Sequence, residues 1–386
     1  MNLQLHDFEE IRPIAPEELP AAFDELLSDS AFCEILRSFY PNVPIELLKA
    51  RIYSCKNNLE VQLKILYPLV KDLVAKCTAG LQIDAESFDA DARKGSFTFV
   101  SNHRDIVLDS ALLSLLIIDN GFRTTTEIAI GDNLLIYPWI KTLVRVNKSF
   151  IVKRSVSMRE MLASSKLMSE YMHFAISEKH ENIWIAQREG RAKDSDDRTQ
   201  ESVLKMMAIG GEGTPIERLK ALNIVPLAIS YEYDPCDFLK AKEFQQKRDD
   251  ASFKKSRADD LQNMKTGIFG YKGRVQYRLA RPINTWIDEL ESLPKAQLFV
   301  ELARRMDTEI HKNYEIFPSN HVALDLLRCS DAQSANYTAE DKARFETYLA
   351  QRIAMVDLPN RDETFLRERI LTMYANPLIN HLAAKL

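Results

Sequence analysis

The chain has 386 residues, of which 46% are hydrophobic and 28% charged, a balance typical of globular proteins rather than of disordered or fibrous ones. Its net charge of -5 argues against a general nucleic-acid binder, because such proteins usually carry a basic excess. The five cysteines are scattered without a CxxC pair, so they indicate neither a disulfide framework nor a zinc cluster and favour a cytoplasmic protein.

The beginning of the chain has neither a basic start nor an apolar stretch, which is unlike an ordinary secretory signal. The longest apolar stretch, residues 110–118, is about half the roughly 20 residues needed to span a bilayer. We therefore expect a soluble cytoplasmic protein, or one that lies peripherally on the inner face of the membrane.

Residues 1–90 are predicted to form an N-terminal helical segment. Apolar residues recur there at alternating spacings of four and three, clearest at Leu59, Leu63, Leu66, Val70, Leu73 and Cys77. Pro68 lies inside this stretch and should kink it or divide it into two helices, while Pro41 and Pro44 mark an earlier break. The pattern indicates a helical cap rather than a coiled coil.

From about residue 96, short β-rich runs alternate with longer helical ones. Strands are expected at 97–100, 125–130, 150–152, 183–186, 224–230 and 275–279, and helices at 107–118, 156–177 and 202–209. Such alternation predicts an α/β domain over residues 91–297, with a largely parallel mixed sheet and flanking helices. Pro226 suggests that its strand is an edge or carries a bulge, and the charge-dense residues 240–265 predict an exposed helical insertion.

Residues 298–386 return to a helical pattern. Thr338 and Asp341 have the spacing of a capping box, and Thr364 is another plausible helix start. N-terminal and C-terminal helical segments are therefore expected around one α/β domain.

The most informative run is SNHRDIVLD at 101–109, which places His103 between an apolar strand and an apolar helix. A histidine there is suited to base chemistry, because its pKa lies near working pH and the loop leaves one ring nitrogen accessible. A carboxylate on the other nitrogen would fix the tautomer and stabilise the imidazolium, and Asp105 and Asp109 both follow closely. The alternative is a capping turn with an incidental histidine.

Three further blocks follow this run in order: GDNL at 131–134 with FIVKR at 150–154, IWIAQREGR at 183–191, and IVPLAISY at 224–231. The ordered set resembles the glycerophospholipid acyltransferases, the group of glycerol-3-phosphate and lysophosphatidate acyltransferases. Their corresponding patterns are a histidine and aspartate pair, GxNL with FIxR, EGxRS or GGRDR, and VPVxISY. The resemblance covers roughly residues 96–235.

The spacing of the first block departs from the family pattern, in which four residues separate the histidine from the aspartate. Here five residues separate His103 from Asp109, and Leu108 fills the family position. Either the turn before the helix absorbs the extra residue and Asp109 orients His103, or Asp105 takes that role. We favour Asp109, because the helix can begin one residue later.

The resemblance implies that His103 removes the proton from a glycerol hydroxyl, which attacks an acyl thioester without a covalent enzyme intermediate or any metal or organic cofactor. It also implies that a phosphate is bound by Lys153, Arg154, Arg191 and Lys193, and that Glu189 and Gly190 position the acceptor. Without the resemblance, Lys153 and Arg154 are expected to form a solvated strand end, and residues 189–193 to form part of a mixed-charge surface loop.

An apolar run at 134–140 is a candidate acyl groove or membrane contact, with Leu135, Tyr137 and Trp139 as its main residues. The alternative is that this run is simply core.

The expected function is acyl transfer from acyl-ACP or acyl-CoA to glycerol 3-phosphate or 1-acylglycerol 3-phosphate in phospholipid synthesis, with peripheral membrane contact and no nucleic-acid partner. The Ser230-Tyr231 strand and the N-terminal helical segment lean toward the glycerol-3-phosphate branch. Two alternatives are an O-acyltransferase for an aminolipid or other lyso-lipid acceptor, and a non-catalytic relative that binds a lipid or anion.

Overall fold

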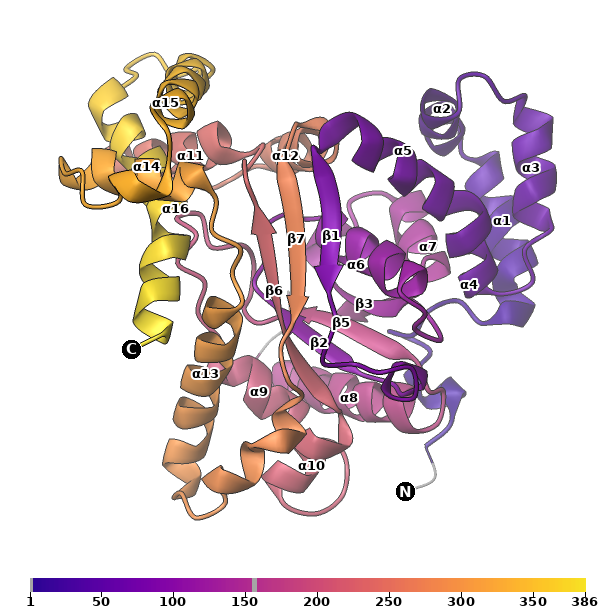
Figure 1. Ribbon diagram of the computed structural model, residues 1–386. Coiled ribbons are helices and arrows are strands. Elements are labelled where there is room, and N and C mark those ends of the chain that lie inside the picture. Colours follow the sequence, from indigo (N-terminus) through magenta and orange to yellow (C-terminus); the bar gives the residue numbers. More distant parts are fainter. Residues whose placement is uncertain (1–2, 155–157) are drawn as a thin grey trace.

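The computed structural model describes residues 3–154 and 158–386. Its centre is a seven-stranded sheet with the strand order β1-β7-β6-β2-β5-β3-β4 (Figure 1). The strands are β1 Gly80–Asp84, β2 Thr98–Ser101, β3 Thr126–Gly131, β4 Ser149–Val152, β5 Asn182–Ala186, β6 Ile224–Tyr231 and β7 Arg274–Leu279. All neighbouring strands are parallel except β6 and β7. The predicted α/β class, the mixed and largely parallel sheet, and all six predicted strands are confirmed.

Strand β1 lies inside the segment that was expected to be helical. It pairs in parallel with β7, in the register Gly80 to Arg274, and forms one edge of the sheet. Only Leu81 and Ile83 are hydrophobic within it, and no residue of the strand is fully buried. A short edge strand of this kind has too little apolar alternation to stand out in a sequence.

The prediction that Pro226 marks an edge strand or a bulge is wrong. Its strand β6 is internal and pairs with β2 on one side and β7 on the other. The carbonyl of Pro226 accepts a hydrogen bond from the N–H of Ala280, so its nitrogen also points toward β7. The ladder with β7 begins only at Leu227, and the missing N–H therefore falls where no ladder bond is needed.

Helices cover both faces of the sheet. They are α1 Leu19–Ser28, α2 Ser30–Phe39, α3 Ile45–Tyr53, α4 Asn58–Val61, α5 Tyr67–Cys77, α6 Leu108–Asp119, α7 Pro138–Val146, α8 Met158–Ser177, α9 Glu201–Met207, α10 Pro215–Ala221, α11 Asp237–Asp249, α12 Arg257–Phe269, α13 Lys295–Lys312, α14 Pro318–Arg328, α15 Ala339–Ala354 and α16 Glu363–Ala384. Val100 points into the core beneath α8, α9 and α13, whereas Phe99 points into the core beneath α5 and α6. Alternate residues of a strand thus fill two cores.

The predicted helices at 107–118 and 202–209 are confirmed as α6 and α9. Helix α8 corresponds to the prediction for 156–177, of which Val156 and Ser157 lie outside the described residues. Pro68 does not separate two helices, because helical backbone runs without a gap from Asn58 to Cys77; a π-helical turn, Gln62–Leu66, lies directly before Tyr67 and Pro68. Such a turn is one way in which a helix accommodates a break in its hydrogen-bond ladder.

The charged residues 240–265 are helical, but the prediction that they form an exposed insertion is wrong. Helix α11 packs its Phe238 and Leu239 into a core with α14, α15 and α16. Lys240 is buried and pairs with Asp234 at 2.5 Å. Its charge is therefore compensated inside the protein, a pairing that composition alone cannot indicate.

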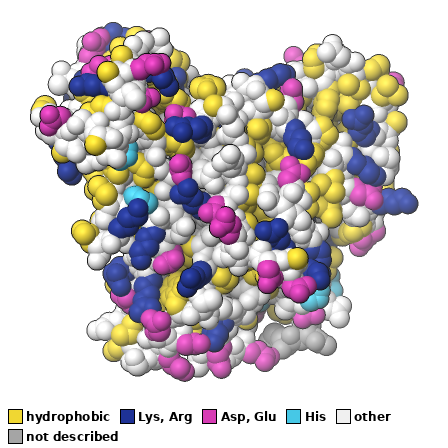
Figure 2. Space-filling model, in the orientation of Figure 1, with side chains coloured by type: hydrophobic (Ala, Val, Ile, Leu, Met, Phe, Trp, Pro, Cys, Tyr) yellow, Lys and Arg dark blue, Asp and Glu magenta, His cyan; other side chains and the backbone are white. Residues whose placement is uncertain are grey.

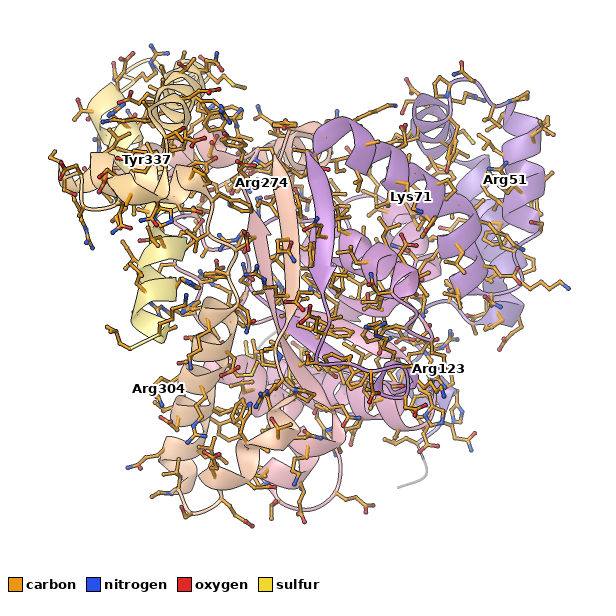
Figure 3. All side chains as sticks on the ribbon, viewed as in Figure 1. Arg51, Lys71, Arg123, Arg274, Arg304 and Tyr337 are labelled. Carbon is orange, nitrogen blue, oxygen red and sulfur yellow. The ribbon has the colours of Figure 1, made fainter. Side chains whose placement is uncertain are left out.

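The N-terminal and C-terminal helices form separate clusters on opposite sides of the sheet, marked by Arg51 of α3 and by Tyr337 just before α15 (Figure 3). In the space-filling view, hydrophobic side chains gather over the N-terminal helices and Lys and Arg over α13 (Figure 2). Thr338 caps α15 in the predicted capping box, whereas the cap of α16 is Asp362 rather than Thr364. Within the described chain, every helix falls short of the length and apolarity that crossing a membrane requires.

Candidate active site

The carboxyl ends of β2, β5, β3 and β4 meet at one edge of the sheet, because these neighbouring strands are parallel. The segments that follow them carry His103, residues 188–194, residues 131–134 and Arg154. Together with α7, α11 and α12 they enclose a cavity of about 800 Å³. This volume is within the range of pockets that bind small molecules.

His103 lies on the wall of the cavity, and its side chain is 13% exposed. Its Nδ1 is 2.8 Å from Oδ2 of Asp109, and its ring packs edge-on against Trp184 with the ring centroids 5.5 Å apart. An ionised carboxylate only accepts hydrogen bonds, so Nδ1 carries the proton and the lone pair of Nε2 can accept another. This is the geometry of a general base with an orienting carboxylate.

Asp109 is completely buried and is held on both carboxylate oxygens. Oδ2 also accepts the backbone N–H groups of Arg104 and Asp105 at 2.7 and 3.0 Å, and Oδ1 accepts the hydroxyl of Tyr231 at 3.0 Å. Asp109 lies in the first turn of α6, which begins at Leu108. The turn before the helix thus absorbs the additional residue, as we expected when favouring Asp109.

Asp105 does not contact His103 but caps α6. Its Oδ1 accepts the N–H groups of Val107 and Leu108 at 2.9 and 2.8 Å, two donors that a helix start leaves without partners. Burial raises the pKa of Asp105, and the nearby charge of Asp109 raises it further. The opening run therefore contains one carboxylate that contacts the histidine and another that caps the helix.

The loop that carries His103 is tied to the sheet on both sides. Asn102 donates its amide to the carbonyl of Ile229 and accepts the N–H of the same residue, both at 2.8 Å, so a side chain extends the ladder between β2 and β6. On the other side, the indole N–H of Trp184 donates to Ser101 Oγ at 3.0 Å. These bonds fix the end of β2 and the position of the loop that carries His103.

Arg104 extends away from His103 and forms a buried ion pair with Asp197 at 2.9 Å. Burial is the largest single influence and lowers the pKa of Arg104, but the nearby acidic groups, Asp197 first among them, together outweigh it and raise the pKa of the guanidinium. A broken buried pair leaves an uncompensated charge, so this contact resists movement of the loop.

The cavity brings together most of the predicted cations. Arg154, Arg191 and Lys193 line it, whereas Lys153 lies outside it and pairs with Glu10. The expectation that Lys153 joins the others is therefore not met, because alternate residues at a strand end point to opposite sides. Lys193 pairs with Glu243, and burial lowers its pKa.

Arg191 uses only part of its hydrogen-bonding capacity within the described residues. Its Nη2 donates to Asn263 Oδ1 at 3.1 Å, but its buried Nη1 has no partner among the described residues. Nearby charges, among them Asp105, outweigh burial and keep the pKa of Arg191 raised. A buried donor without a partner is costly.

Glu189 and Gly190 both line the cavity. The Glu189 side chain is 69% exposed and lies 3.5 Å from Arg154, while its N–H donates to Gln200 Oε1 at 2.7 Å. Gly190 has a φ of 67°, a left-handed conformation that favours glycine and turns the chain toward Arg191.

The apolar run at 134–140 divides between two environments. Trp139 lines the cavity, whereas Leu135 packs against the core under α8 and therefore follows the alternative prediction. Tyr137 remains 50% exposed and stacks on Trp139 with the ring centroids 6.4 Å apart. Only one of the three candidate groove residues thus faces the cavity.

Several lining residues were not predicted as site residues. Arg188 faces the cavity and makes no side-chain hydrogen bond or ion pair within residues 3–154 and 158–386. Asn263 and Met264 come from the segment that was interpreted as exposed. Arg188 was visible in the third block, but the acids after it suggested a surface loop.

The cavity thus combines a histidine hydrogen-bonded to a carboxylate, several cations and an apolar wall. Such a set can accept a proton from a hydroxyl, hold an anion and shelter a hydrocarbon chain.

Comparison with known proteins adds little to this geometry. No protein-family model matches the chain, and no curated protein matches it. Among solved structures, the 1-acyl-sn-glycerophosphate (LPA) acyltransferase PlsC from Thermotoga maritima is similar over 75% of this chain and 93% of its own, with 11% sequence identity and a TM-score of 0.36. At this level of similarity, function has to be inferred from the residues of the site.

Proposed function

We propose that the protein is a glycerolipid O-acyltransferase, which transfers a fatty acyl group from a thioester to a hydroxyl of glycerol 3-phosphate or its 1-acyl derivative. The observation that carries this proposal is the hydrogen bond between His103 and Asp109 on the wall of a cavity that Arg188 and Arg191 also line. The ordered blocks between residues 96 and 235 point to the same chemistry.

In the proposed reaction, Nε2 of His103 takes the proton of the acceptor hydroxyl as its oxygen attacks the thioester carbonyl. The tetrahedral intermediate then expels the thiolate, which takes the proton back from the imidazolium and leaves as a thiol. Asp109 stabilises the imidazolium while it exists, through the 2.8 Å hydrogen bond to Nδ1. The products are an ester and a free thiol, and the enzyme returns to its initial state.

The acceptor phosphate is assigned to Arg188 and Arg191, with Arg154 and Lys193 at its margin. Guanidinium groups suit a phosphate because their donors match two of its oxygens at once. The partner of Arg154 is a mostly exposed glutamate 3.5 Å away, which an anionic ligand can displace at little cost. The donor carrier is coenzyme A or acyl carrier protein, and the site of action is the cytoplasmic face of the membrane.

The proposal is tested with the purified protein, a long-chain acyl-CoA and either glycerol 3-phosphate or glycerol, with release of free thiol as the readout. We expect turnover with the phosphorylated acceptor and little with glycerol, because glycerol has no group for the arginines. His103→Gln should lower kcat by at least about 10³-fold, since it removes the base.

The matched control is His180→Gln, which alters an exposed histidine outside the cavity and should leave kcat unchanged. Thiol release by His103→Gln at the rate of the unaltered protein would contradict the role of the base. Binding of glycerol 3-phosphate without any thiol release would favour a non-catalytic anion-binding protein.

A further inference from the structure

One wall of the cavity comes from the segment between β6 and β7. Met264 and Ile268 of α12 and Phe244 of α11 line it, and α12 lies across the end of the central strands (Figure 1). Another part of the lining is formed by Trp139, Ile140 and Leu143 of α7. Apolar side chains thus line the cavity from α7 and from the pair α11 and α12, which are far apart in the sequence.

Helix α12 is fixed against the same residues that form the polar end of the site. A Cβ at Gly267 would lie 2.0 Å from Asp105 Oδ2, so the helix backbone can approach the cap of α6 only because this residue is glycine. Asn263, one turn earlier, accepts the hydrogen bond from Arg191. The wall therefore has a set position relative to His103.

A cavity lined by cations and by His103 as well as by apolar helices matches a ligand with a polar reacting end and a hydrocarbon chain. Each methylene that such a chain buries raises the affinity by about fourfold, until the chain meets a side chain that stops it. A residue at a fixed position on an apolar wall then acts as a limit on chain length.

We infer that α12 sets the acyl-chain length that the enzyme accepts, with Met264 and Ile268 as the residues that limit it. This inference rests on the proposed function. It places the acyl chain of the thioester donor in the apolar part of the cavity. The Met264 side chain is half-buried and unbranched, so a larger or smaller side chain at this position should change the space that is left for the acyl chain.

The test measures kcat/KM for a series of saturated acyl-CoA donors from short to long chain, with glycerol 3-phosphate as acceptor. Met264→Trp should lower the ratio of kcat/KM for the longest donor to that for a medium one by about tenfold or more, because the indole takes the space of several methylenes. Met264→Ala should shift the same ratio toward longer donors. Lys265→Trp, at the exposed neighbouring position, is the control and should leave the ratio unchanged.

A uniform loss with all donors, or a ratio equal to that of the unaltered protein, would overturn the inference while leaving the proposed function intact. Absence of thiol release by the unaltered protein with every donor would overturn the proposed function itself. If Met264→Trp does not fold, as judged by its melting curve, the ratio for Met264→Ala decides: a shift supports the inference and no shift overturns it.

Discussion

Asp109 determines the orientation of His103, although Asp105 is closer to it in sequence. A carboxylate two residues after His103 lies in the turn itself, where its nearest donors are the N–H groups at the start of α6. Asp109 lies one helical turn further on and points back along the helix toward the loop. The helix geometry thus decides between two residues of the same type.

This difference predicts opposite effects for two conservative changes. Asp109→Asn should lower kcat by about 10³-fold and leave both KM values within about threefold, because the imidazolium loses its countercharge while the shape of the site is kept. Asp105→Asn should change kcat by less than about threefold, because asparagine caps a helix as well as aspartate does. Steady-state kinetics with thiol release measure both.

The melting temperature of each variant provides the control for folding. Equal losses of kcat in the two variants, with unchanged melting, would mean that Asp109 has no special role at His103.

For single residues, the sequence predicts contacts between positions close in the chain better than contacts between distant positions. The partner of His103 is six residues away and follows from helix geometry, so it was predicted. The partner of Lys153 is Glu10, which no local pattern could indicate. Arg188 was visible in the sequence, but its place on the cavity wall depends on how the loop after β5 folds.

Among the elements, six strands were predictable because their hydrophobic residues either run continuously, as in β6, or alternate with polar ones, as in β7. Strand β1 was not predictable, since it is short and half-exposed and pairs with β7 through backbone hydrogen bonds. The close approach of α12 to Asp105 was not predictable either, because a glycine in a charge-rich helix indicates lower helix stability rather than a tight contact.

Because α12 contacts the cap of α6, we expect a glycine-to-alanine substitution, which usually stabilises a helix, to destabilise this protein. Gly267→Ala in a helix interior would ordinarily stabilise by about 1 kcal/mol. Here we expect destabilisation by about 1–3 kcal/mol, because the new Cβ meets Asp105 Oδ2 and forces the two helices apart. Urea unfolding measures the change.

Two matched variants make the cause specific. Gln262→Ala, at an exposed position of the same helix, should change stability by less than about 0.5 kcal/mol. In an Asp105→Ser background, which keeps a capping side chain but shortens it, Gly267→Ala should no longer destabilise. Destabilisation that persists in that background would rule out the clash as its cause.

For the whole molecule, buried neutral histidines link stability to pH. His311 is 2% exposed, shares a 2.9 Å hydrogen bond between its Nε2 and the carbonyl of Asp197, and has a pKa of about 4, chiefly because of burial. Burial also lowers the pKa of His173 and His381. At these histidines the unfolded chain therefore binds more protons than the folded one as pH falls below 6.5, and their contribution to stability is lost as pH falls.

Buried carboxyl groups with raised pKa values, such as Asp197, act in the opposite direction, so a single variant is needed to isolate the effect of His311. Lowering the pH from 7.5 to 5 should cost the unaltered protein about 2 kcal/mol more than His311→Gln, measured by urea unfolding at each pH. A stability difference between the two proteins that does not change with pH would show that His311 is not buried in its neutral form.

The pairing of β1 with β7 also affects how the protein is made. On the ribosome, β1 emerges long before β7, and at typical rates of synthesis it waits on the order of ten seconds or more for the strand that it pairs with. A nascent or truncated chain that ends before β7 would leave β1 unpaired and one edge of β6 open. Chaperone protection during translation is therefore most needed for this half-built sheet, whose open edges can pair with other chains.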